Sequence, residues 1–102
     1  MTNMHFEELW EKCENFHKES GIDQSIANLI DELSYKITLY KALDAKTEIP
    51  AEELQKAKSR TLGEILLTLT NLSLKDNVNV FDALGVALQY KSVGFYNQKH
   101  SQ

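Results

Sequence analysis

The chain contains few of the residues that interrupt helices and strands, with four glycines and one proline among 102 residues. Because Gly and Pro mark turns, such a chain has few turns and long elements between them. An all-β fold of short strands would need many more breaks, so the composition predicts long helices. The length suits a single domain with one core.

Other scarcities restrict the classes of protein to which the chain could belong. The single cysteine, Cys13, cannot form an intramolecular disulfide, and its register with apolar neighbours predicts a buried thiol rather than a nucleophile. No apolar run approaches the ~18 residues of a membrane span, and Met1 to Trp10 lack a signal pattern. We therefore expect a cytoplasmic protein with no membrane partner. A net charge of −4 without basic blocks also argues against a nucleic-acid partner.

Apolar residues recur at spacings of three and four in four segments, which is the pattern of helices with a buried face. The segments cover residues 3–19, 23–45, 50–75 and 79–91. From Ser92 the pattern fades. The sequence therefore predicts an all-α domain at 1–91, built as an antiparallel four-helix bundle, and a C-terminal tail at 92–102 that is mobile or docked on a partner subunit.

The few helix-breaking residues stand between these segments. Gly21 is placed to end the first helix in a left-handed conformation, and Asp23 is a good N-cap for the second. Pro50 suits the first turn of the third helix. Asn77 can take the left-handed conformation at the end of that helix, and Asn79 can cap the fourth.

Two helices have more apolar surface than one core requires. The segment 23–45 has apolar residues on two faces, and residues 62–74 are apolar nearly all round. Helices of this kind lie at the centre of a core or between subunits. We therefore expect a homo-oligomer, a dimer or a tetramer.

Few residues have the pattern that metal-dependent phosphate chemistry requires. Mg²⁺ prefers several converging oxygen ligands, which helices supply most simply as pairs of carboxylates one turn apart. Glu32 and Glu64 both lack such a partner, because Tyr35 follows Glu32 by one turn and Thr61 precedes Glu64 by one turn. Each acid is therefore either solvated or paired with a neighbour such as Arg60 or Lys36, or else belongs to a metal site completed by weaker oxygen donors.

Three short motifs follow one another along the chain: I-D-E-L-S-Y at 30–35, T-L-G-E-I-L at 61–66 and N-V-N-V-F-D-A-L at 77–84. Together with F-E-E-L at 6–9 and Gly21, their order and spacing resemble the MazG-like family of all-α nucleoside triphosphate pyrophosphohydrolases. The resemblance covers most of the chain. It implies a nucleotide partner and a site in which E-x-x-E and E-x-x-D motifs hold Mg²⁺ while water attacks and pyrophosphate leaves.

The chain departs from the family at the implied metal site. Glu32 keeps the first acid, Tyr35 and Thr61 replace the second and third, and Glu64 stands in place of the aspartate. Losing two carboxylates removes about half of the negative charge that draws a divalent ion out of water. Asp31 could supply one replacement ligand.

The positions at which many family members contact the nucleotide are also changed. The family's Lys and Asn on the last helix are represented here by Ala87 and Lys91. The resemblance implies metal ligation by Glu32 and Glu64, to which Asp31 would be added as the replacement ligand. It also implies substrate contacts from three further residues: Lys91, Tyr35 and Thr61.

The sequence leaves three functions open. The first is an oligomeric nucleotide-binding or regulatory module in which catalysis is weakened or lost. The second is an active Mg²⁺-dependent pyrophosphohydrolase with a rearranged site. The third is a helical adaptor for protein interactions.

Overall fold

The computed structural model describes residues 5–21 and 23–100, in which all regular secondary structure is helical. Its four helices are α1 (Phe6–Ser20), α2 (Ile26–Asp44), α3 (Ala51–Lys75) and α4 (Val80–His100). The prediction of an all-α chain with four helices is confirmed. In the described part of the chain no helix is both long enough and apolar enough to cross a membrane.

The ends of α1 and α3 follow from residues that tolerate a left-handed backbone. Gly21 has φ 66° after α1, and Asn77 has φ 58° after α3, as the sequence predicts. The side chain of Asn79 then begins α4, because its Oδ1 accepts hydrogen bonds from the backbone N–H groups of Phe81 at 3.0 Å and Asp82 at 3.2 Å. These residues set the turn from which α4 departs.

The start of α2 differs from the sequence-based expectation. Ser25 is the N-cap, and its hydroxyl oxygen accepts a hydrogen bond from the Asn28 N–H at 3.1 Å. Asp23, predicted as the cap, instead accepts a hydrogen bond from Lys75 at the end of α3. This bond lowers the pKa of Asp23. The prediction for Asp23 is wrong because a lysine brought close by the tertiary fold competes for its carboxylate.

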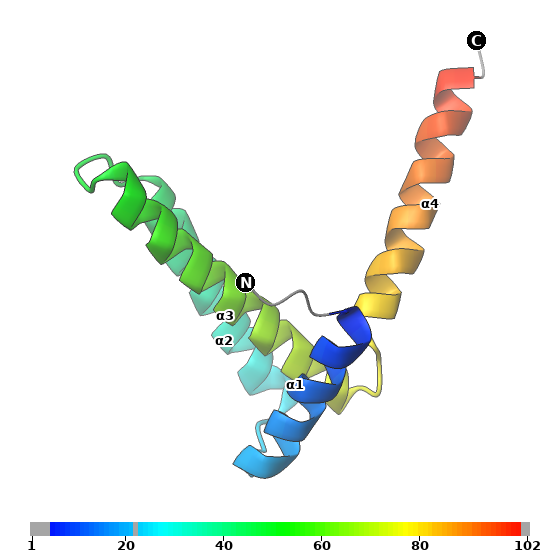
Figure 1. Ribbon diagram of the computed structural model, residues 1–102, viewed down its shortest axis with the longest axis horizontal. Coiled ribbons are helices and arrows are strands. Elements are labelled where there is room, and N and C mark those ends of the chain that lie inside the picture. Colours follow the sequence, from blue (N-terminus) through cyan, green and yellow to red (C-terminus); the bar gives the residue numbers. More distant parts are fainter. Residues whose placement is uncertain (1–4, 22, 101–102) are drawn as a thin grey trace.

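Helices α2 and α3 form an antiparallel hairpin, and α1 lies across the end of the hairpin where α2 begins (Figure 1). Leu29 is the core of this arrangement and is only 2% exposed. At the opposite end of the hairpin, the Lys58 ammonium lies 2.8 Å from an Asp44 carboxylate oxygen and 6.0 Å from the centre of the Tyr40 ring. The hairpin is thus joined by an apolar contact at one end and an ion pair at the other.

Helix α4 points away from the hairpin, so that the two form the arms of a V (Figure 1). Its start is held by Phe81, whose ring meets that of Trp10 edge to face at 6.0 Å. Between Asp82 and Phe95 every residue except Ser92 is exposed. The bundle packing is therefore partial within one chain.

Helix α4 also ends later in the chain than the sequence predicts, since the fourth predicted segment stops at residue 91. The helix continues unbroken past Ser92, where the apolar pattern weakens, to His100. A docked or mobile role for the predicted tail stays a prediction. The last two residues of that tail, 101–102, lie outside the described residues.

Candidate functional site

A small polar cleft opens where the end of α1 meets the hairpin. Its volume is about 200 Å³, and residues of α1, the α1–α2 connection, α2 and α3 line it. Its polar lining residues are His17, Ser20, Gln24, Glu32, Lys36, Thr68 and Asn71. Three apolar side chains complete the walls: Phe16, Leu29 and Leu67.

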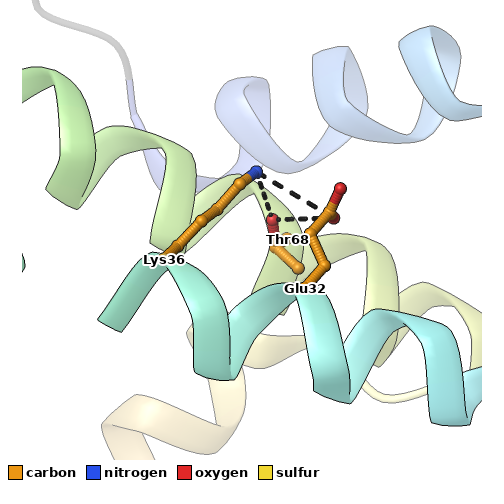
Figure 2. Close-up of polar contacts among 3 residues, drawn as sticks. All are labelled: Glu32, Lys36 and Thr68. Carbon is orange, nitrogen blue, oxygen red and sulfur yellow. Dashed lines mark hydrogen bonds and ion pairs between the residues drawn. The ribbon is translucent and has the colours of Figure 1, made fainter. Parts of the chain in front are cut away.

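Three side chains form a connected polar cluster across the hairpin (Figure 2). The Lys36 ammonium donates a hydrogen bond to the Thr68 hydroxyl at 2.9 Å. That hydroxyl donates to Glu32 Oε2 at 3.2 Å, while the distance between Lys36 Nζ and Glu32 Oε2 is 3.9 Å. Thr68 is 2% exposed, so its hydroxyl depends on these two partners to satisfy its hydrogen-bonding capacity.

The helical repeat places the members of this cluster. Glu32 and Lys36 lie one turn apart on α2, so they share a face. Leu29, nearly one turn before Glu32, is buried and fixes how this face approaches α3. The antiparallel packing then brings Thr68 of α3 between the two charged groups.

The charges in the cluster balance one another. Glu32 carries the only carboxylate among the described residues that line the cleft, and the Lys36 ammonium lies beside it. The Glu32 side chain is 37% exposed and that of Lys36 is 21% exposed, so water screens the pair only in part. A divalent cation placed at Glu32 would meet a positive charge about 4 Å away.

The cleft also contains a buried acceptor without a partner. The amide oxygen of Asn71 is inaccessible to water and accepts no hydrogen bond. Leaving such a group unsatisfied costs about 1–3 kcal/mol. Asn71 follows Thr68 by three residues on α3, and both line the cleft. A ligand in the cleft reaches this oxygen only if neighbouring side chains move aside.

Of the residues predicted to bind metal, the structure places one in the cleft. Glu32 lines it, whereas Glu64 and Asp31 are exposed and are not among the described lining residues. Within residues 5–21 and 23–100, no group of three or more His, Cys, Asp or Glu side chains could hold a metal ion. The cleft residues therefore do not fit Mg²⁺ well, and a site built on these three acids stays a prediction.

The residues predicted to contact substrate lie outside the cleft. Tyr35 is 64% exposed on α2. The Thr61 hydroxyl donates to the Ala57 carbonyl at 2.9 Å, within its own helix. Lys91 is exposed on α4, which points away from the hairpin. None of these three is among the described residues that line the cleft with Glu32.

Sequence patterns identify only part of this cleft. Lys36 is a foreseeable partner of Glu32, because it follows it by one turn of helix. His17 and Gln24 carry no such signal, because they reach the cleft from α1 and from the connection that follows it. Their contribution depends on how α1 crosses the hairpin.

Comparison of the chain with models of protein families, with curated proteins and with solved structures finds no match.

Proposed function

We propose that the chain is a MazG-like, homo-oligomeric module that binds a nucleotide at the polar cleft, with pyrophosphohydrolase activity weakened or lost. The observation that carries this proposal is the position of Lys36, whose ammonium lies beside Glu32 and Thr68. In the family that the sequence resembles, this region supplies negative charge for Mg²⁺. Here the Lys36 ammonium offsets the one carboxylate that remains, that of Glu32.

The cluster offers complementary groups to a nucleotide. An ammonium has three donors, and the bond from Lys36 to Thr68 uses one of them. The others can reach a phosphate oxygen directly, without a metal between them. Glu32, whose side chain is 37% exposed, can accept hydrogen bonds from ribose hydroxyls or from a base amino group.

The size of the cleft limits how much of a nucleotide it can enclose. Its volume of about 200 Å³ is below the ~300–1,000 Å³ that is usual for small-molecule sites. Only part of a nucleoside triphosphate is therefore enclosed, and the remainder lies in solvent or against another subunit. We expect modest affinity and little exclusion of water, a poor environment for catalysis.

Calorimetry with the four nucleoside triphosphates tests the proposal, in EDTA and in Mg²⁺. We expect binding in EDTA, and a loss of affinity of about tenfold or more in Lys36→Met, since a hydrogen bond to a charged group contributes ~1.5–3 kcal/mol. Lys56→Met is the matched control, because Lys56 forms an exposed ion pair one turn from Glu52 on α3, away from the cleft. No heat with any nucleotide would overturn the proposal.

A pyrophosphate-release assay separates the proposal from an active hydrolase. We expect little turnover in the presence of Mg²⁺ or Mn²⁺. Robust release that Glu64→Ala abolishes would establish the rearranged catalytic site instead. If neither binding nor turnover is found, the helical adaptor becomes the better description of the chain.

A further inference from the structure

An apolar groove lies on the side of the chain that faces α4. It has a volume of about 510 Å³, and α1, α3 and the start of α4 line it. None of its described lining residues is charged. Its walls include Leu9, Cys13, Leu66, Leu67 and Leu84. Gly63 leaves a gap in the surface of α3, since a Cβ added there would meet no atom within 4 Å.

Helix α4 carries two apolar stripes on opposite sides. Leu84 and Leu88 form one stripe and are 57% and 64% exposed. The other consists of Val86, Tyr90 and Val93, of which Tyr90 is 81% exposed. At 100° per residue, the centres of the two stripes lie roughly 180° apart. A helix with this pattern is built to pack between two neighbours.

The total surface of the chain exceeds that of a compact monomer. A compact protein of 11.7 kDa exposes about 5,900 Å², whereas this chain exposes 8466 Å². The radius of gyration is 17.1 Å, against about 13 Å for a compact chain of this length. The excess of about 2,600 Å² is comparable to the roughly 1,000–2,500 Å² that each copy buries in an obligate homodimer.

The connection to α4 directs most of this helix away from the groove of its own chain, and only its first turns line the groove (Figure 1). Asn77 turns the backbone, Asn79 caps the helix, and the contact between Phe81 and Trp10 holds the first turn against α1. From this anchored start a continuous helix leads away from the hairpin (Figure 1). The α4 of another copy has no such restraint. Its 21 residues span about 32 Å, enough to lie along α3.

We propose that two copies of this chain exchange α4, so that the α4 of each copy lies in the groove formed by α1 and α3 of the other. One stripe of α4 packs on the partner's groove, and the opposite stripe packs on the partner's α4 near a twofold axis. The inference rests on the homo-oligomeric part of the proposed function and does not require a ligand in the cleft. Loss of nucleotide binding alone therefore leaves it intact.

The oligomeric state of the full chain tests the exchange, measured by light scattering and sedimentation at micromolar concentration. We expect twice the mass of one chain. Leu66→Glu in the groove and Leu88→Glu on α4 should each weaken association by at least about 100-fold, because each places a charge in an apolar interface. Ile37→Glu is the matched control, because Ile37 is an exposed apolar residue on α2, 52% accessible.

Two results would overturn the proposal. One is a monomer at these concentrations. The other is a dimer that Ile37→Glu dissociates while both leucine variants leave it intact, which would place the interface on α2. Far-UV circular dichroism of each variant shows whether the helices remain, so that loss of association is distinguished from loss of folding.

Cross-linking between two differently tagged chains identifies which copy supplies α4. One chain keeps Cys13 in its groove, and the other carries Cys13→Ala together with Leu88→Cys on α4. A short bismaleimide should join the two chains to each other. A mixed dimer that gives no such product, while a single chain carrying both cysteines links internally, would show that α4 folds onto its own groove.

Discussion

Replacing Gly63 by alanine has opposite expected effects in the isolated chain and in the exchanged dimer. In the isolated chain the new Cβ meets no atom within 4 Å. Alanine is more favourable than glycine in a helix interior by about 0.8–1 kcal/mol. The free energy of unfolding of the isolated chain should therefore rise by about 1 kcal/mol.

In the exchanged dimer that we propose, the same methyl group would occupy space that the partner's α4 takes. Overpacking of a filled interface costs typically about 1–3 kcal/mol per site. A twofold dimer contains two such grooves, so Gly63→Ala should weaken association by about 30-fold or more. The two effects can be measured separately. Unfolding in dilute solution reports the stability of the single chain, and sedimentation at high concentration reports the affinity of association.

The measurement pairs urea unfolding of dilute protein with sedimentation equilibrium of concentrated protein. Ser34→Ala on α2 is the control, because Ser34 is exposed and outside the groove. It should raise stability by a few tenths of a kcal/mol and leave association unchanged. A Gly63→Ala chain that gains about 1 kcal/mol and dimerises as tightly as before would refute the packing of α4 over this position.

Two further predictions concern the stability of the hairpin. Leu29→Ala should lower the free energy of unfolding by about 2–5 kcal/mol in urea titrations, since Leu29 is 2% exposed and fills the contact between the helices. A loss of less than about 1 kcal/mol would show that Leu29 is not a core residue. Acid should weaken the hairpin through Asp23 and Asp44, because hydrogen bonds from lysines hold the pKa of each carboxyl below its ordinary value. Their contribution is present above the unfolded pKa, near pH 4, and is lost as pH falls through the lower folded pKa. A double Asp23→Asn, Asp44→Asn variant should therefore show a shallower loss of stability below pH 4, and an unchanged acid slope would contradict these pairings.

The local features of the fold were predictable because they depend on residues close together in the sequence. Gly21 and Asn77 adopt left-handed backbones where the pattern places them, since few other residues tolerate that conformation. Asn79 caps α4 for a similarly local reason. Asp23 shows where local reasoning fails, because its carboxylate accepts a hydrogen bond from Lys75, 52 residues away, and Ser25 caps α2 in its place.

The cleft and the path of α4 depend on tertiary geometry that periodicity does not contain. The spacing of Glu32 and Lys36 indicates an ion pair, but it cannot indicate that Thr68 joins them, because that depends on the alignment of the hairpin. The apolar stripes of α4 likewise indicate neighbours on two sides. They carry no information on whether those neighbours belong to the same chain.

The split between a hairpin and a projecting helix also has a consequence for folding kinetics. The hairpin forms by closing one short connection between adjacent helices, the kind of local contact that forms quickly and at a rate independent of concentration. In the exchanged dimer, α4 gains its neighbours only when two chains collide. Refolding should therefore show a fast first-order phase and a slower phase whose rate rises with protein concentration. Kinetics in which no phase depends on concentration would mean that α4 finds its place within a single chain.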